Sequence, residues 1–477
     1  MRISELYSIF LKYPIVTTDS RNCPAGAIFF ALKGEKFDGN DYIEQALHNG
    51  AAYAVGDRAN LPQNNRIIHV DNSLQSLQNL ANYHRKQLNP KVIAITGTNG
   101  KTTTKELIAA ALSTQYPTLF TQGNLNNHIG VPLTLLQLKP EHRYAVIEMG
   151  ANHKGEIREL CQIADPDYGL ITNVGKAHLE GFGSFEGVVR AKTELYDYIS
   201  EKNGLIFVNI DNPILKERSR NANAVYYGTT TKALIQGRIM ESESCLEMEW
   251  GIFINEGLSK IYHDVIARAS ARSNPFRINN LDCFTSFAMT KNETYEASLT
   301  QEWFRIKTQL AGNYNFENVL AAICVAICMD VKIENLNHAI ADYTPANNRS
   351  QILKTQRNHL IVDAYNANPS SMQVAFDNFL SLKVSPKMAI IGEMKELGEY
   401  SREEHQKLVD RLRESAIDKV ILCGENFQNT RLIAPEWKVY QNTQELLDYL
   451  KSEKISEYHI LIKGSRANQL EKTLEFL

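Results

Sequence analysis

The sequence lacks the features of membrane-spanning and secreted proteins. It has no apolar run long enough to cross a bilayer. The opening MRISELYSIFLKYPIV places Glu5 and Lys12 among its apolar residues, whereas a signal peptide has a basic start followed by an apolar stretch. We therefore expect a cytoplasmic protein without a membrane span.

The sequence also lacks an excess of basic residues. Lysine and arginine total 51 against 54 aspartates and glutamates, which gives a formal net charge of -3. Broad binding to a nucleic-acid backbone depends on clustered positive charge, so we expect no nucleic-acid partner. A local basic pocket for one nucleotide is compatible with this balance.

The 7 cysteines form no CxxC pair, a pattern typical of reduced thiols in the cytosol. Cys324 and Cys328 could share one face of a helix and hold a metal, but they lie in the apolar run AAICVAICM. We therefore favour burial of both as small hydrophobic side chains over metal binding.

The length of 477 residues exceeds what one hydrophobic core usually serves, and a prior of about 150 residues per domain predicts three domains. We place them at 1–88, 89–343 and 344–477, and we expect a monomer. Hydrophobic residues at 43% and charged residues at 22% are ordinary for a soluble enzyme, so composition names no function.

Strand-like runs alternate with helix-forming stretches, which predicts an α/β fold. In the first domain, AIFFAL and AAYAV accompany a helical stretch, as in a small α/β domain. In the second, helices separate KVIAIT, YAVIEMG, DYGLITNV and GLIFVNI, so we expect a doubly wound parallel sheet. In the third, HLIVDAYN, MAIIGEM, DKVILCG and YHILIKG predict a Rossmann-like unit. The pattern weakens over 228–305, which we interpret as a possible peripheral insertion.

A phosphate-binding loop, TGTNGKTTT, follows the first strand of the second domain. Backbone N–H groups and a helix N-terminus favour an anion there. Lys101 supplies positive charge to the outer phosphates, and the Thr102 hydroxyl can ligate magnesium. The general pattern has glycine where this chain has Ile95, and a chance glycine turn is the alternative. The order strand, turn, Gly-Lys-Thr and helix favours ATP binding by Gly97, Thr98, Asn99, Gly100, Lys101, Thr102 and Thr103.

TGTNGKTTT and several later motifs resemble, in order, those of the Mur ligases and their folylpolyglutamate synthetase relatives. Motifs similar to the central domain are GNLNNHIGVPLTLL, EMGANHKGEI, ITNVGKAHLEGFGS, AKTELYDYI and AGNYNFENVLAA. Motifs similar to the C-terminal domain are DAYNANPSSM, IGEMKELGEYSREEH and KGSRANQLE. TTDSR and GAIFFALKGEKFDGNDYI resemble the N-terminal UDP-binding domain. Only the tract 228–305 is uncovered, and Tyr314 stands where the family more often has histidine.

The resemblance implies an ATP-dependent ligase of peptidoglycan synthesis that works through an acyl-phosphate and releases ADP. EMGAN and DAYNANPSSM are similar to the branch of the family that adds D-alanyl-D-alanine to a UDP-N-acetylmuramoyl-tripeptide, so we expect these two substrates. The motifs do not distinguish diaminopimelate from lysine as the third residue of the tripeptide.

The resemblance also implies roles for single residues. The implied catalytic residues are Lys101, Glu148, His178 and Lys192. The implied magnesium ligands are Thr102, Glu148, His178 and Lys192, with Lys192 carbamylated by carbon dioxide. Judged without the family, Glu148 is a solvated glutamate, His178 a structural histidine and Lys192 a surface lysine on a helix.

The resemblance also assigns further residues to the binding of ATP and the substrates. The ATP contacts that the resemblance implies are Asn315, Asn318, Arg349 and Asp363. The substrate contacts that the resemblance implies are Ser20, Arg21, Asn126, Asn127, Tyr365, Asn366 and Asn368. Alternatives exist, because asparagines also cap helices and form turns, and Arg21 could form a surface ion pair.

Two other functions compete with this interpretation. A folylpolyglutamate-type ligase shares the ATP chemistry but differs in its substrate motifs. A catalytically silent scaffold gated by nucleotide belongs to another class, and the joint presence of the phosphate-loop lysine with the expected metal ligands argues against it.

Overall fold

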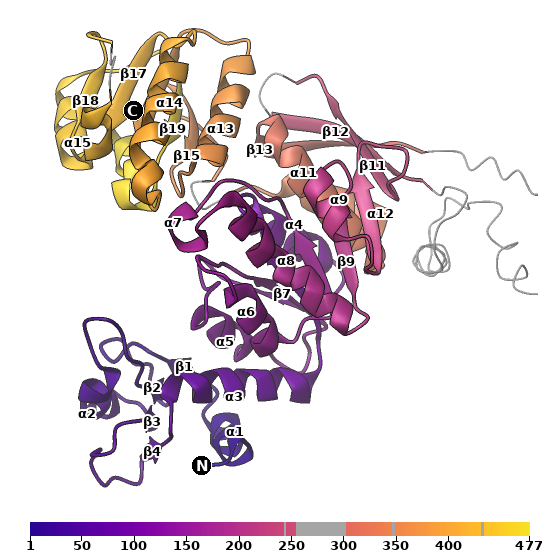
Figure 1. Ribbon diagram of the computed structural model, residues 1–477, viewed down its shortest axis with the longest axis vertical. Coiled ribbons are helices and arrows are strands. Elements are labelled where there is room, and N and C mark those ends of the chain that lie inside the picture. Colours follow the sequence, from indigo (N-terminus) through magenta and orange to yellow (C-terminus); the bar gives the residue numbers. More distant parts are fainter. Residues whose placement is uncertain (243–244, 254–301, 346–348, 431–433) are drawn as a thin grey trace, which may run out of the picture. The chain divides into compact units, whose positions relative to one another are not determined.

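The structure is a computed structural model that describes residues 1–242, 245–253, 302–345, 349–430 and 434–477 (Figure 1). The chain divides into two compact units. The first unit comprises Met1–Thr96, Gln115–Leu170 and Ala191–Ile206, and the second comprises Gly97–Thr114, Ile171–Arg190 and Phe207–Leu477. Within the described ranges, no helix is both long enough and apolar enough to pass through a membrane.

The N-terminal part of the first unit holds a small parallel sheet in the order β1-β2-β3-β4. Its strands are β1 (Val16–Thr17), β2 (Ile28–Phe30), β3 (Tyr53–Gly56) and β4 (Ile67–His69). The runs AIFFAL and AAYAV therefore form the expected strands. Phe29 and Ala54 from the sheet pack against Ile43 and Leu47 of helix α2 (Ile43–His48), which closes a small core.

Helix α3 (Ser73–Leu88) packs against α1 (Ile3–Lys12), α5 (Gly130–Leu135) and α6 (Glu156–Ala164). The Asn72 side chain caps its start by accepting a hydrogen bond from the Gln75 N–H at 2.8 Å. Its end is marked by Asn89 in the left-handed conformation, with φ of 49°.

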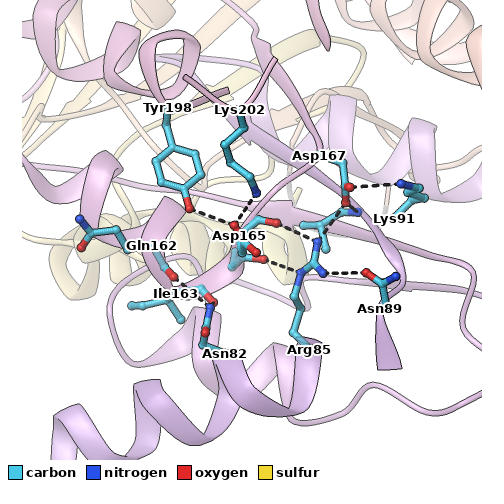
Figure 2. Close-up of polar contacts among 12 residues, drawn as sticks. Asn82, Arg85, Asn89, Lys91, Gln162, Ile163, Asp165, Asp167, Tyr198 and Lys202 are labelled. Atoms are coloured by element: carbon cyan, nitrogen blue, oxygen red, sulfur yellow. Dashed lines mark hydrogen bonds and ion pairs between the residues drawn. The ribbon is translucent and has the colours of Figure 1, made fainter. Parts of the chain in front are cut away.

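A polar cluster around Arg85 fixes the last turn of α3 (Figure 2). The guanidinium donates to the carbonyls of Ala164 at 3.1 Å and Asp165 at 2.8 Å, which satisfies the C-terminal end of α6. It also pairs with the Asp167 carboxylate at 3.0 Å, and that carboxylate accepts the N–H of Val92 at 2.9 Å. These contacts lie at the amino ends of β5 and β8, whereas parallel sheets bind ligands at the carboxyl ends, so we assign the cluster a structural role.

We expect Arg85→Met to lower the free energy of unfolding by about 3–5 kcal/mol, because it leaves two carbonyls without their donor and removes the buried cation that pairs with the Asp167 carboxylate. The matched control is Lys91→Met. Lys91 pairs with the same Asp167 carboxylate at 3.3 Å, but its side chain is 55% exposed against 5% for Arg85. The control should lose about 0–1 kcal/mol. Urea denaturation followed by circular dichroism measures both variants, and equal losses would contradict the structural role of Arg85.

A nine-stranded sheet has the order β13-β12-β11-β10-β9-β8-β5-β7-β6. Its strands are β5 (Lys91–Thr96), β6 (Thr118–Phe120), β7 (Tyr144–Glu148), β8 (Tyr168–Ile171), β9 (Leu205–Asn209), β10 (Ala224–Gly228), β11 (Ile235–Met240), β12 (Cys245–Ile252) and β13 (Phe304–Ala311). β7 runs parallel to both β5 and β6, as expected for a doubly wound sheet, and β11, β12 and β13 form an antiparallel edge.

Part of the tract 228–305 belongs to this sheet. β11 and β12 come from it, and the side chains of Leu246, Met248 and Trp250 are fully buried. Every second residue of β12 therefore faces a core, and this alternation is typical of a strand with one buried face. The expectation of a peripheral insertion then applies to residues 254–301, and these lie outside the described residues.

The C-terminal sheet has the order β14-β15-β19-β16-β17-β18 and is parallel except for the β14–β15 pair. Its strands are β14 (Gln351–Lys354), β15 (His359–Asp363), β16 (Lys387–Gly392), β17 (Lys419–Cys423), β18 (Lys438–Tyr440) and β19 (His459–Lys463). Ile391 packs in a cluster with Phe376 of α13 (Pro369–Ser381) and Val409 of α14 (Ser401–Arg413). Its neighbour Ile390 packs in another cluster with Leu446 of α15 (Thr443–Ser452). The two faces of the sheet are therefore both covered, and the expected Rossmann-like unit is confirmed.

Candidate active site

The phosphate loop lies between β5 and helix α4 (Lys101–Ser113). Gly97 and Gly100 have φ of 143° and 79°, which favour glycine. A Cβ at Gly97 would collide with the Thr172 hydroxyl, and one at Gly100 would collide with the amide of Asn318. Both glycines are therefore required by conformation and by close packing.

The neighbouring loop after β8 holds the phosphate loop in place. The N–H groups of Thr98 and Asn99 donate to the carbonyl and side-chain oxygens of Asn173 at 3.0 and 2.9 Å. The Gly175 N–H donates to the Thr98 hydroxyl at 2.9 Å. Two N–H groups of the loop are thus used within the protein. The first turn of α4, where backbone N–H groups have no acceptor within the helix, is the part of this segment suited to an anion.

Lys101 is the first residue of α4, and its ammonium donates to the carbonyls of Gly97 at 2.7 Å and Thr98 at 3.0 Å. The positive charge is therefore held over the loop itself, at the helix N-terminus. Thr102 and Thr103, the next two residues, are buried. A cation at a helix N-terminus is an arrangement suited to the phosphates of a nucleotide, and the ATP contacts of these residues stay a prediction.

Asn315 and Asn318 support the phosphate loop. The Asn318 side chain accepts a hydrogen bond from the Thr104 hydroxyl at 3.1 Å and donates one to the Asn315 side-chain oxygen at 3.0 Å. Asn315 in turn donates to the carbonyl of Ala311 at 2.7 Å. Both side chains are buried, so their amides are engaged inside the protein, and a contact with adenine stays a prediction.

His178 lies in the left-handed region, with φ of 49°, directly before the short helix α7 (Leu179–Phe182). Its Nδ1 pairs with the carboxylate of Glu396, a residue that follows β16 and also has a positive φ of 61°. The hydrogen bond with His178 lowers the pKa of Glu396 below its usual range, against the opposing effect of burial. With Nδ1 engaged, Nε2 is the ring nitrogen of His178 through which a ligand could bind.

Arg349 and Tyr365, two of the predicted ligand contacts, lie together near the carboxyl end of β15. The Arg349 guanidinium stacks over the Tyr365 ring, 3.7 Å from its centroid. The buried Nε of Arg349 has no hydrogen-bond acceptor among the described residues. This donor is therefore suited to a ligand oxygen.

Asn368 has two local partners. Its side-chain oxygen caps α13 by accepting the Ser371 N–H at 2.8 Å, and its Nδ2 donates to the Asn99 side chain at 3.0 Å. The helix-capping alternative is thus observed for Asn368, in addition to a link with the phosphate loop. Asn366 is exposed, and its side chain is not used as a cap.

In the first unit, Glu148 ends β7 and is 2% exposed. Its Oε1 accepts a hydrogen bond from Asn126 Nδ2 at 2.8 Å. The Asn127 side-chain oxygen accepts hydrogen bonds from the N–H groups of Ile129 and Gly130 at 3.1 and 2.9 Å, in the loop that leads into α5. The structure thus brings Glu148 and Asn126 together, and the roles of Asn126 and Asn127 as substrate contacts stay predictions.

Lys192 lies on α8 (Phe185–Glu201) and is 3% exposed, so the alternative of a surface lysine is wrong. Its ammonium donates to the carbonyl of Ala151 at 3.4 Å. In the N-terminal sheet region Ser20 is buried, and its carbonyl accepts from Asn49 at 2.9 Å. The exposed Arg21 pairs with Asp19 at 3.1 Å, which is the ion pair considered as its alternative role.

A magnesium site was expected from Thr102, Glu148, His178 and Lys192. The described residues contain no group of three or more histidine, cysteine or acidic side chains arranged around one point. The donor chemistry of Thr102 and Glu148 nevertheless fits magnesium, which prefers hydroxyl and carboxylate oxygens. For Cys324 and Cys328 no metal group is found in the described ranges, and burial raises the pKa of Cys324.

Two charged residues of the site carried no predicted role. Lys463 pairs with Asp363 at 2.6 Å, and Glu396 pairs with His178. Both lie in motifs that the sequence contains, KGSRANQLE and IGEMKELGEYSREEH. The signal for Lys463 is a lysine at the end of the apolar run YHILIK, where a charge requires a buried partner.

Family models match most of the chain. The Mur ligase middle domain matches residues 95–326, the glutamate ligase domain of Mur ligases matches 348–466, and the catalytic domain of the Mur ligase family matches 12–85. The chain therefore belongs to the Mur ligase family.

Within this family the chain is similar to UDP-N-acetylmuramoyl-tripeptide--D-alanyl-D-alanine ligases. It is 32% identical to the Bacillus subtilis protein, over 97% of this chain and 92% of the relative, and 32% identical to the Escherichia coli protein, over 99% and 95%. A MurF crystal structure from Acinetobacter baumannii has a TM-score of 0.77 at 29% identity and covers 96% of this chain and 92% of that chain. The Thermotoga maritima MurF ligase in complex with ADP has a TM-score of 0.78 at 26% identity, over 98% and 97%.

Proposed function

We propose that the chain is an ATP-dependent ligase that joins D-alanyl-D-alanine to a UDP-N-acetylmuramoyl-tripeptide in the synthesis of peptidoglycan precursors. The observation that carries the proposal is the similarity to ligases of this name over nearly the full length of both chains. A cytoplasmic location and a monomeric state belong to the proposal as well.

The reaction has two steps. A carboxylate oxygen of the tripeptide bonds to the γ-phosphorus of ATP while the bond to ADP breaks, and ADP leaves with the electron pair. The amine of D-alanyl-D-alanine then attacks the acyl carbon, loses a proton and displaces phosphate. All reacting oxygens are anionic, so charge neutralisation controls both steps.

The second unit supplies the nucleotide side of this chemistry. In the proposal, the Lys101 ammonium turns from the loop carbonyls to the outer phosphates, and the N–H groups of the first turn of α4 bind the same anion. Arg349 and Asp363 contact the phosphates and the ribose, while Tyr365, Asn366 and Asn368 lie near the incoming dipeptide. Asn315 and Asn318 hold the loop in its binding conformation.

The first unit supplies the other expected contacts. Ser20 and Arg21 bind the UDP-sugar, and Asn126 orients the carboxylate of Glu148. Magnesium, held by Thr102 and Glu148 with His178 and a carbamylated Lys192, would supply additional positive charge beside the phosphates. This role fits the oxygen donors of the first two residues.

The substrate assignment predicts that ADP forms only when both substrates are present. The measurement is phosphate release from ATP with a panel of UDP-muramoyl peptides, each combined with D-alanyl-D-alanine or with single amino acids. The tripeptides ending in diaminopimelate and in lysine are tested separately. Robust turnover with single amino acids would refute the assignment.

Two controls separate the competing functions. Turnover with folate and glutamate would indicate a folylpolyglutamate-type ligase. Binding of a fluorescent ATP analogue without turnover on any substrate pair would indicate a nucleotide-gated scaffold.

A further inference from the structure

The carboxyl edge of the C-terminal sheet contains a buried ion pair that joins two neighbouring strands. Asp363 is the last residue of β15 and Lys463 the last residue of β19, and the two are opposite each other in the parallel register. Lys463 Nζ lies 2.6 Å from Asp363 Oδ2, and the side chains are 1% and 18% exposed. This is the edge where parallel α/β sheets bind ligands.

The ammonium of Lys463 has a second acceptor in the loop that follows β15. It donates to the backbone carbonyl of Asn366 at 3.1 Å. The ammonium of Lys463 therefore fixes both ends of the segment 363–366, because it binds the side chain of Asp363 and the backbone carbonyl of Asn366. The rest of this segment carries Tyr365, whose ring lies under the Arg349 guanidinium.

The geometry leaves part of Asp363 available for a ligand. Lys463 occupies Oδ2, and no hydrogen bond is made by Oδ1 to any of the residues that the structure describes. Burial raises the pKa of the Tyr314 phenol, and the negative charge of Asp363 adds to this effect. A carboxylate with one oxygen fixed and one open is oriented to accept a hydrogen bond from a hydroxyl group.

We propose that Lys463 is a positioning residue, which orients Asp363 toward the nucleotide and holds the 363–366 loop in the conformation that receives the incoming dipeptide. The proposal rests on the proposed function, which places Asp363 at the nucleotide and Asn366 at the dipeptide. Lys463 itself is buried, so it acts through these groups and not by contact with a ligand.

The test compares Lys463→Met with a matched control, Lys451→Met. Lys451 lies on α15 of the same sheet unit and pairs with Asp448 at 2.9 Å, but both side chains are at least half exposed. We expect Lys463→Met to weaken binding of a fluorescent ATP analogue about tenfold or more, because a hydrogen bond to a charged group is worth about that factor. The KM values for ATP and D-alanyl-D-alanine should rise, while the KM for the UDP-linked tripeptide stays unchanged. The control should change none of these values.

A double-mutant cycle with Asp363→Asn separates positioning from general destabilisation. If Lys463 acts through Asp363, Lys463→Met should weaken nucleotide binding much less in the Asp363→Asn background than in the wild type. Equal effects in both backgrounds, or a folded Lys463→Met with wild-type constants, would overturn the proposal. So would wild-type nucleotide binding by Asp363→Asn. If Lys463→Met does not fold, Lys463→Gln, which keeps one donor, undergoes the same cycle with the same criteria.

Because the double-mutant cycle is measured by nucleotide binding, its result does not depend on whether the proposed reaction takes place. If the wild-type chain binds the ATP analogue but forms no ADP with the two substrates, the proposed function is refuted. The double-mutant cycle of Lys463 and Asp363 then still tests the role of Lys463, because it is measured by nucleotide binding. Normal turnover by the wild type with normal binding by Lys463→Met would refute the role of Lys463 alone.

Discussion

Lys101→Ala is expected to slow ADP formation by about 10²–10³-fold or more while leaving the fold intact. The ammonium of Lys101 is held at the N-terminus of α4, and its hydrogen bonds go to the two loop carbonyls of Gly97 and Thr98. No other residue of the phosphate loop 97–103 carries a positive charge. Its loss therefore removes the cation that balances charge on the transferred phosphoryl group.

The fold should persist because alanine is a good helix former at the first position of α4. Steady-state release of phosphate measures the rate, and circular dichroism with thermal unfolding measures the fold. Lys216→Ala is a suitable control, since Lys216 is an exposed lysine on α9 (Pro213–Arg218) of the same unit. A folded Lys101→Ala protein with near-normal turnover would exclude the assignment of this loop to ATP.

The strands and the phosphate loop could be predicted because their signals are local. Runs such as KVIAIT and MAIIG are apolar over the length of one strand, and the structure confirms them as β5 and β16. The loop is local too, since Gly97, Gly100 and Lys101 are close in the sequence. The requirement for glycine, however, comes from Thr172 and Asn318, which are distant in the sequence and were not assigned this role.

Pairings between distant residues could not be predicted. Lys463 and Asp363 are 100 residues apart, and they meet because β19 inserts between β15 and β16, an order that periodicity does not reveal. His178 and Glu396 are also distant in the sequence, so their pairing could not be predicted either. Asparagine roles were also ambiguous, because the same amide can cap a helix or bind a ligand. Asn127 accepts a hydrogen bond from the nearby Gly130 N–H, whereas Asn126 donates to the Glu148 carboxylate.

Lys192→Ala is the second variant for which we expect loss of most activity, because we propose that Lys192 acts as a carbamate. In this reaction the neutral amine bonds to the carbon of carbon dioxide and loses one proton, which converts a cation into an anion. A free lysine amine has a pKa of about 10.4, so on the order of 0.1% is unprotonated near neutral pH. A surrounding that disfavours the ammonium is therefore required for this reaction. The side chain of Lys192 on α8 is 3% exposed.

Charge distinguishes the carbamate from an unmodified lysine. An ammonium near the expected magnesium ligands would repel the metal, whereas a carbamate would favour it. Lys192→Arg keeps the length and the positive charge but cannot form the carbamate under these conditions, since arginine stays protonated. We therefore expect Lys192→Arg to be as inactive as Lys192→Ala. If a permanent cation were sufficient, the arginine variant would retain activity.

Two measurements test the carbamate directly. Acetate should restore part of the activity of Lys192→Ala, because a small carboxylate can occupy the vacated space, and it should not restore Lys192→Arg, where the side chain fills that space. Incubation with ¹³C-labelled carbon dioxide should give a carbamate signal in the ¹³C NMR spectrum of the wild type that is missing in both variants. A crystal structure with bound nucleotide in which Lys192 is unmodified and directed to solvent, together with full activity of Lys192→Ala, would overturn the assignment.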